Sequence, residues 1–147
     1  MRLSTRARYG LRAVVDLAER FGGDPVPLGA IASRGKMSRK YLHAIFTVLK
    51  SAGFVRSVRG TEGGYVLTRK PSQIRLNEIL EALEGSLSPS ECVDDAGVCE
   101  RSSQCVTREI WRDIGRAIDD VLCEVTLEDL VRRNQKCGGS GPPMYHI

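Results

Sequence analysis

Apolar residues in the first third of the chain recur at spacings of three and four, which places them on one face of an α-helix. One such run covers residues 4–20, a shorter one covers residues 28–32, and a third covers residues 38–53. Glycines and prolines interrupt the pattern after the first run, and Gly35 permits a tight turn before the third. Ser38 can cap the third helix, because its side chain can accept a hydrogen bond from a free N–H group. The pattern therefore predicts three helices before residue 54.

The pattern then changes to the period of two that is typical of strands. Residues 54–60 and 65–69 alternate apolar with polar positions, and the turn residues 61–64, TEGG, separate them. Two short helices joined by a Gly-containing turn indicate a helix-turn-helix, and a hairpin directly after it indicates a winged helix. The sequence thus predicts a mainly α fold with a small β-hairpin wing.

The second half of the chain returns to helical spacing. Residues 74–83 form a short amphipathic run ending at Gly85, and Thr126 can cap a final short helix over residues 127–134. Between them, a run of roughly 20 residues carries one broad apolar stripe made of Ile110, Trp111, Ile114, Ile118, Val121, Leu122 and Val125. A small winged helix does not suffice to cover this stripe, so the pattern favours a long C-terminal dimerisation helix that pairs with a second chain. The alternative is a helix that folds back onto its own domain.

The chain divides into three parts. We expect a winged-helix DNA-binding region over residues 1–70, and a linking helix, cysteine loop and dimerisation helix over residues 71–135. Residues 136–147 are rich in Gly and Pro and are predicted to form a flexible tail. No apolar run has the roughly 18 residues of a membrane span, and the N-terminus lacks the apolar stretch of a secretory signal. We therefore expect a cytoplasmic protein without a membrane partner.

Charge is distributed unevenly between the two halves. Residues 1–70 carry 14 Lys and Arg against 4 Asp and Glu, whereas residues 71–147 carry 8 against 14. A basic half of this kind suggests a polyanionic partner such as DNA, although a merely solvated basic surface gives the same count. In a helix-turn-helix, the start of the second helix contacts base edges. The predicted DNA-binding residues are Ser38, Arg39, Lys40 and His43 on that helix and Arg56, Arg59 and Gly60 on the hairpin.

Three of the five cysteines fall within residues 92–105, CVDDAGVCERSSQC. This segment has no hydrophobic periodicity, so packing does not explain its thiols. In a reducing compartment, clustered cysteines bind metal or sense redox state more often than they form structural disulfides. The spacing of six and then five intervening residues differs from the Cys-x-x-Cys of structural zinc sites. A metal site and a thiol-based switch both remain open, with inert or zinc-binding cysteines as the third alternative.

Several long segments together carry a specific resemblance to a family. These are MRLSTRARYGLRAVVDLA, YLHAIFTVLKSAGFVRSVRGTEGGYVL, IRLNEILEALEG, the three spaced cysteines, and CVTREIWRDIGRAIDDVLCEVTLEDLV. The chain is similar to IscR/NsrR-type bacterial winged-helix transcriptional regulators, the Rrf family. The resemblance implies a homodimer that binds double-stranded promoter DNA. It also implies an iron–sulfur cluster, [2Fe-2S] or [4Fe-4S], held by Cys92, Cys99 and Cys105, whose state alters the affinity for DNA.

The resemblance leaves the fourth cluster ligand unknown. Some relatives use a His three residues after the last cysteine, where this chain has Arg108, and others use an Asp near the N-terminus, where it has Arg8. A guanidinium has no lone pair to offer a metal. The remaining candidates are Asp94, Asp95, Glu109, Cys123, a residue of the partner subunit or a small exogenous ligand. We expect Cys123 to act as a small buried hydrophobe and Cys137 to be an incidental exposed thiol in the tail.

The resemblance also implies roles in DNA recognition. Arg59 matches the family's minor-groove arginine, and the glycines at 60, 63 and 64 shape the turn that presents it. His43 stands where some relatives carry a Glu that accepts from a cytosine amino group, so we expect a different operator sequence. The alternative is that His43 contacts only phosphate or solvent.

Together these observations predict a transcriptional regulator whose promoter affinity is controlled by an iron–sulfur cluster that senses redox, nitric oxide or iron–sulfur status. One alternative is a cluster-free regulator of the same fold that senses through thiol oxidation or a partner protein. An alternative of another class is an iron–sulfur carrier protein. We expect no enzymatic activity, because the chain has two His, no phosphate-cradling Gly-rich loop and no nucleophile–base constellation.

Overall fold

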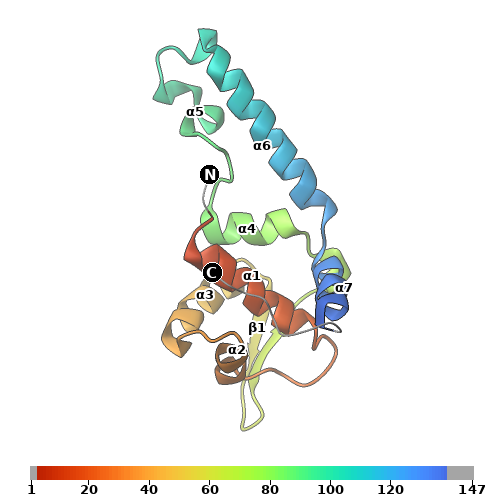
Figure 1. Ribbon diagram of the computed structural model, residues 1–147. Helices are drawn as coiled ribbons and strands as arrows, with labels where there is room; N and C mark the ends of the chain where they lie inside the picture. The colour runs from red at the N-terminus through yellow and green to blue at the C-terminus, as the bar shows by residue number, and fades with distance from the viewer. Residues whose placement is uncertain (1–2, 139–147) are drawn as a thin grey trace.

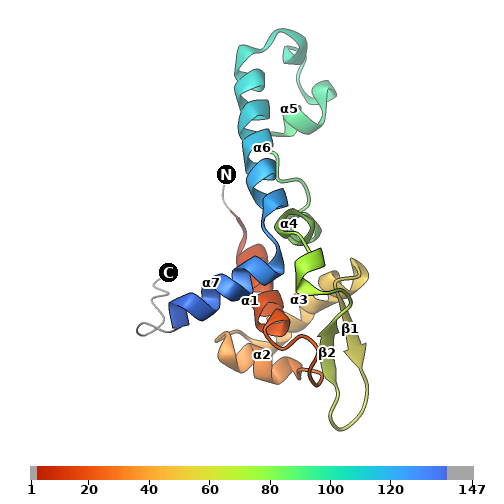
Figure 2. The same cartoon turned by 90° about the vertical axis from the view of Figure 1, so that its right-hand side faces the viewer.

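Short helices and a two-stranded hairpin form the lower part of the molecule, and one long helix projects from it (Figures 1 and 2). The computed structural model describes residues 3–138. Within them, no helix combines the length and the apolarity needed to cross a bilayer. In chain order the elements are α1 (Thr5–Ala18), α2 (Leu28–Arg34), α3 (Arg39–Ser51), β1 (Val55–Val58), β2 (Gly64–Leu67), η1 (Pro71–Gln73), α4 (Leu76–Glu84), α5 (Glu91–Asp94), η2 (Ala96–Val98), η3 (Ser102–Gln104), α6 (Val106–Glu124) and α7 (Leu127–Gly138). We call residues 85–124 the arm and the rest the body.

The first and third helices begin at residues that cap them. Ser4 precedes α1 and Ser38 precedes α3, and the side chain of each accepts a 3.1 Å hydrogen bond from the backbone N–H three residues on. These bonds satisfy donors that have no partner in a first helical turn. The turn between α2 and α3 includes Gly35, as predicted. Because α2 continues through Arg34, Gly35 keeps an ordinary φ of −79° and Lys36 takes the left-handed conformation with φ of 51°.

One hydrophobic core holds the body together. It is formed by the inward faces of α1, α3 and α4, with Val14, Phe46 and Leu83 fully buried. The predicted stripe of α3 is buried as expected except at Tyr41, which is half-buried and packs edge-on against Tyr9 with 6.1 Å between ring centroids. Burying a large apolar side chain contributes roughly 1.5–3 kcal/mol. The core therefore fixes α3 with its polar face outward.

The wing is an antiparallel hairpin that is shorter than the sequence predicts. β1 pairs with β2 in a register that places Val55 opposite Leu67, and residues 59–63 form the loop that closes the hairpin. The backbone of Tyr65 also pairs with Val26 in the α1–α2 loop, through N–H···O bonds of 3.0 and 2.9 Å. This additional pairing ties the wing to the body.

The close approach between the wing and the α1–α2 loop requires a glycine at position 64. A Cβ there would overlap the backbone of Val26 and lie 2.7 Å from the nitrogen of Pro27. We expect Gly64→Ala to lower the free energy of unfolding by about 2 kcal/mol, as overpacking does. Gly23→Ala is the matched control, because its Cβ would meet only the Arg20 carbonyl oxygen at 3.4 Å. Urea unfolding measures the difference, and equal midpoints for the two variants would contradict the prediction.

The arm is anchored to the body at the C-terminal end of α6. The N–H of Leu76 donates to the Val125 carbonyl at 2.9 Å, and the N–H of Leu127 donates to the Ile74 carbonyl at 3.0 Å. These two bonds join the segment before α4 to the segment after α6. They fix one end of α6, while its other end carries the cysteine loop away from the body (Figure 2).

The final helix begins at its predicted cap and ends later than expected. The Thr126 hydroxyl accepts from the N–H of Asp129 at 3.2 Å, and the Asp129 carboxylate accepts from the Thr126 N–H at 2.9 Å, which is a reciprocal capping arrangement. α7 continues past residue 134 to Gly138, so Cys137 is an exposed residue of a helix instead of a tail. The rest of the predicted tail, residues 139–147, lies outside the described residues.

The apolar stripe of α6 is covered only at its lower end. Leu122 and Val125 pack against the core. Farther along the helix, Ile110, Trp111 and Val121 are 56%, 40% and 63% exposed, and Val106 and Ile114 are exposed too. The fold-back alternative therefore accounts for the last turn of α6 and leaves most of the stripe bare.

Candidate functional site

The outward face of α3 is polar and exposed. Ser38, Arg39, Lys40 and His43 all lie on it, so the structure brings the predicted helix residues together on one surface. Thr47, one turn after His43, is exposed as well, and its hydroxyl donates to the His43 carbonyl at 2.9 Å. Thr47 is not among the residues predicted from the sequence, because the helix-turn-helix pattern points only to the first turns of the second helix. The cations and the Ser38 hydroxyl in this arrangement can donate to phosphates and to base edges, and the Thr47 oxygen can accept.

The predicted hairpin residues lie on the wing next to this helix. Arg56 is exposed on β1, and Arg59 and Gly60 are exposed at the wing tip, where Gly60 has a φ of 125° that L side chains rarely adopt. Lys50 near the end of α3 donates to the hydroxyl of Ser57 on β1 at 3.0 Å. Helix and wing thus present one continuous surface.

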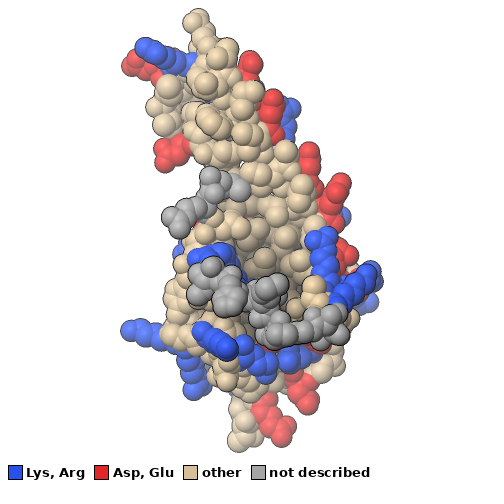
Figure 3. Space-filling view, viewed as in Figure 1, with Lys and Arg blue, Asp and Glu red and all other residues tan. Residues whose placement is uncertain are grey.

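Positive charge concentrates on the body. On the face shown in Figure 3, Lys and Arg side chains gather across the lower half, whereas Asp and Glu are frequent along the arm. Asp16 neutralises part of this charge by accepting hydrogen bonds from Arg20 and Arg34. Four cations are predicted to contact DNA, and none of them has a carboxylate partner within residues 3–138. They are Arg39, Lys40, Arg56 and Arg59. Their charge is available to an external polyanion.

The cysteine loop, residues 92–105, lies at the far end of the arm (Figure 1). Cys92 is half-buried in α5, Cys99 is exposed after η2, and Cys105 is half-buried directly before α6. The Sγ atom of Cys92 lies 3.3 Å from the Ser90 hydroxyl, and that of Cys105 lies 3.1 Å from the Thr107 hydroxyl. The half-buried thiols therefore each contact a hydroxyl two residues away.

The donor chemistry of this loop fits an iron–sulfur cluster, because cysteine thiolates are the ligands that hold such clusters. The thiols are not arranged as a closed metal site. Within residues 3–138, no three His, Cys, Asp or Glu side chains gather where they could hold a metal ion. Binding a cluster would require the three thiols to move together.

The surroundings of Cys105 favour its thiolate. The hydrogen bond with the Thr107 hydroxyl lowers the pKa of the Cys105 thiol, and the N–H of Arg108 acts in the same direction. Cys105 also precedes the first turn of α6, where the positive end of the helix dipole stabilises an anion. The thiolate is the form that binds metal and reacts with oxidants.

Two acidic candidates for a fourth ligand are already engaged. The Asp94 carboxylate accepts hydrogen bonds of 2.5 Å from both Ser86 and Ser88, and these bonds lower the pKa of Asp94. Asp95 accepts a hydrogen bond of 2.7 Å from the N–H of Gly97. Both carboxylates serve the local structure of the loop.

The remaining candidates on the chain are Glu109 and Cys123. Glu109 is exposed in the first turn of α6. Cys123 lies at the opposite end of the helix, about 27 Å from the loop at 1.5 Å per residue, so it is too far to join the same site. Cys123 is expected to be buried, but it is only half-buried. Its thiol donates a hydrogen bond to Asp119 at 3.4 Å. Partial burial and this hydrogen bond raise the pKa of Cys123.

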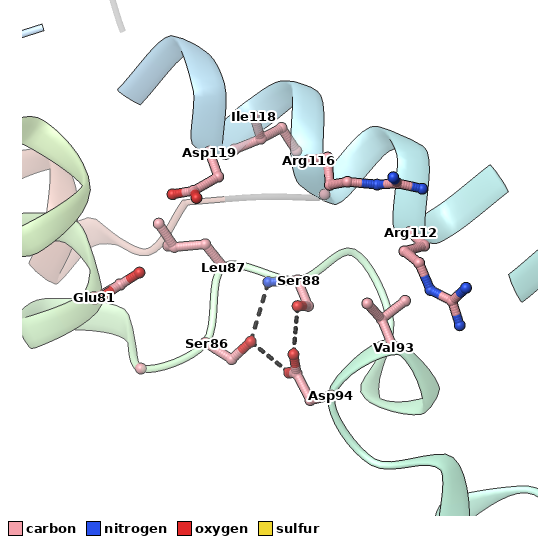
Figure 4. A pocket seen from close by; sticks show the side chains of 12 residues that line it. Glu81, Ser86, Leu87, Ser88, Val93, Asp94, Arg112, Arg116, Ile118 and Asp119 are labelled. Carbon is pink, nitrogen blue, oxygen red and sulfur yellow. Dashed lines mark hydrogen bonds between the residues drawn. The ribbon is translucent and has the colours of Figure 1, made fainter. Parts of the chain in front are cut away.

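A cavity of about 510 Å³ separates α6 from the segment that leads to the loop (Figure 4). Asp94 with its two serines lies on one side, and Arg112 and Arg116 extend from α6. The residues that line the cavity include no His and no Cys. Its hydrogen bonds tie the start of the loop to the base of the arm.

Comparison with known proteins agrees with this geometry. Residues 3–133 match the Rrf2 family, described as an iron-dependent transcriptional regulator. The chain belongs to the Rrf2 family. It is 38% identical over 137 residues to protein rrf2 of Nitratidesulfovibrio vulgaris, and the aligned residues cover 93% of this chain and 91% of that protein. It is 39% identical over 130 residues to the HTH-type transcriptional regulator CymR of Bacillus subtilis, and the aligned residues cover 88% of this chain and 89% of CymR. The solved structure of T. potens IscR matches with a TM-score of 0.79 at 36% identity, covering 99% of this chain and 97% of that one.

This member of the Rrf2 family is a DNA-binding transcriptional regulator. Its predicted fold, a winged helix-turn-helix followed by a long C-terminal helix, is confirmed by the structures of its relatives. The family is one of regulators, which confirms that the chain is not an enzyme and leaves the carrier-protein alternative without support.

Proposed function

We propose that this Rrf2-family regulator works in the cytoplasm as a homodimer that binds a palindromic promoter site. In each half-site, Ser38, Arg39, Lys40 and His43 face the major groove, Arg56 contacts phosphate, and Arg59 at the wing tip enters the minor groove beside Gly60. The observation that carries this proposal is the exposed surface shared by α3 and the wing, whose cations have no carboxylate partner among the described residues.

The bare stripe of α6 supports the dimer. Large apolar side chains in one row on an exposed helix mark a surface that another chain covers. The stripe is carried by an arm that extends from the body, so two copies can pair along it without bringing their bodies together (Figure 1). A dimer built this way presents two copies of α3, as a palindromic site requires.

The cysteine loop would be the sensor of this regulator. Cys92, Cys99 and Cys105 would hold an iron–sulfur cluster as thiolates, and the bound cluster would supply sensitivity to oxidants, nitric oxide or iron supply. Thr107 and Arg108 would contribute by lowering the pKa of Cys105. The helix α6 would contribute by carrying the loop at its free end. A change at the loop would then alter the pairing of the arms, and so the spacing of the two α3 helices.

DNA binding through α3 and the wing is tested by charge removal. We expect Arg39→Ala and Arg59→Ala each to weaken binding by about 1–3 kcal/mol, because each removes a cation from the proposed interface. Fluorescence anisotropy with a palindromic duplex selected from a random library measures this at several salt concentrations. Arg101→Ala removes the same charge from the cysteine loop and should leave the affinity near that of the wild type. Equal losses for all three variants would indicate a general charge effect and contradict the proposed surface.

A second candidate is a cluster-free regulator that responds to thiol oxidation. The observation in its favour is that the three thiols lie apart, with Cys99 exposed and the other two on local hydroxyls. Both candidates use the same DNA-binding surface. They differ in whether iron and sulfide bind to the loop.

A further inference from the structure

Arg108 bridges the two sides of the cysteine loop. From the first turn of α6, its Nε donates to the carbonyl oxygen of Cys92 at 2.6 Å, and its Nη1 donates to the carbonyl oxygen of Ser102 at 3.3 Å. Cys92 belongs to α5 near the start of the loop, and Ser102 belongs to η3 near its end. One half-buried guanidinium therefore joins two segments that lie apart in the sequence.

The chemistry of this contact suits a fixed support. A hydrogen bond from a charged donor is stronger than one between neutral groups. The guanidinium is also planar, with several N–H groups in fixed directions, so it can hold both carbonyls at once. A lysine ammonium is a single point charge and would not reproduce this geometry.

Backbone hydrogen bonds hold the short turns of the loop, but no buried core does. None of the residues from 92 to 105 is buried, so the loop has no core of its own. The bonds from Ser86 and Ser88 to Asp94 tie the start of the loop to the base of the arm. Arg108 supplies the matching connection to α6 on the other side.

We propose that Arg108 is a positioning residue that keeps the cysteine loop folded against α6 while its thiols are free. The loop is then already folded before any ligand binds, although its thiols still have to move together to hold one. The inference deepens the proposed function and rests on it only in treating the loop as the sensor. It changes how that sensor works, because losing the ligand leaves the loop folded, and the signal becomes a shift between two folded forms instead of a transition to disorder.

Limited proteolysis of the full-length, metal-free and reduced protein tests this role. The protease Glu-C cleaves after Glu100, in the middle of the loop, and it acts on the fraction of molecules in which the loop has opened. We expect Arg108→Gln to be cleaved about tenfold faster than the wild type, which corresponds to about 1.4 kcal/mol at 25 °C. Arg108→Lys should fall between the two, because it keeps the charge and loses the paired geometry.

The control is Arg112→Gln, one turn further along α6. This variant loses the same charge, but the Arg112 side chain donates no hydrogen bond to the loop within the described chain. It should be cleaved at the wild-type rate. The melting temperature of the body should stay the same in all variants, which separates loop opening from global unfolding. Cleavage of Arg108→Gln at the wild-type rate, or an equal rise in Arg112→Gln, would overturn the proposal.

Iron and sulfide content, measured on the same variants, tests the cluster proposal separately from the role of Arg108. If the reconstituted wild type binds iron and Arg108→Gln is cleaved at the wild-type rate, the role of Arg108 alone is overturned. Faster cleavage of Arg108→Gln with no iron bound to any variant, including the wild type, would support the role of Arg108 and overturn the cluster alone.

Discussion

Ile114→Asp is expected to convert the protein to a monomer and to weaken binding to a palindromic site by about a hundredfold or more. Ile114 is 40% exposed and lies in the apolar stripe of α6 between Trp111 and Val121. A carboxylate there would lose its hydration when two arms pair, so the paired state is disfavoured. Without the dimer, the second half-site no longer benefits from the high effective concentration that the first contact creates. Sedimentation velocity and anisotropy measure the two effects.

Two comparisons keep this result specific to the stripe. Asp120→Lys changes the charge of an exposed α6 residue outside the apolar row, and it should remain a dimer with wild-type affinity. Trp111 is the only tryptophan, so its emission should shift to shorter wavelength when a dilute wild-type sample is concentrated and the arms pair. An Ile114→Asp protein that sediments as a dimer would refute pairing through this face.

Replacing Cys92, Cys99 and Cys105 together by Ser is expected to abolish iron and sulfide binding after anaerobic reconstitution. Serine hydroxyls are poor ligands for iron compared with thiolates, so the loop would lose its donor set. The variant should show no visible cluster absorbance, and its affinity for the selected duplex should be the same with and without reconstitution. Its metal-free affinity should match that of the metal-free wild type, because the substitutions lie far from α3 and the wing (Figure 1).

The matched control is the double variant of the other two cysteines. Cys123 lies at the anchored end of α6 and Cys137 lies in α7, so replacing both by Ser should leave iron and sulfide binding unchanged. An iron-free wild type whose DNA affinity responds to peroxide, with a triple variant that does not respond, would contradict the cluster and support the thiol switch.

The body could be read from the sequence because local signals and packing agree there. The caps at Ser4 and Ser38 and the buried row of α3 follow directly from residue type and spacing. The left-handed conformation of Lys36 in the α2–α3 turn could not be read, since it depends on how far α2 continues against its neighbours. Residue type alone does not determine where a short helix ends.

The arm shows where sequence reasoning stops. The stripe of α6 is visible as a pattern, yet the pattern does not reveal that only Leu122 and Val125 pack against the core within one chain. The role of Arg108 has no sequence signal either. Its partners are backbone carbonyls, which every residue has, so only the fold decides which ones it contacts.

Every buried apolar side chain of the described chain lies between Ala7 and Leu83 or at Leu127. The arm therefore contributes nothing fully buried to the body within one chain, and most changes in the arm should not disturb the folding of the body. Natural variation can then alter the number, identity and spacing of the groups on the loop while the same DNA-reading body is kept. An architecture of this kind lets one promoter-binding module acquire a new chemical input through changes in a segment of about a dozen residues, with little cost in stability.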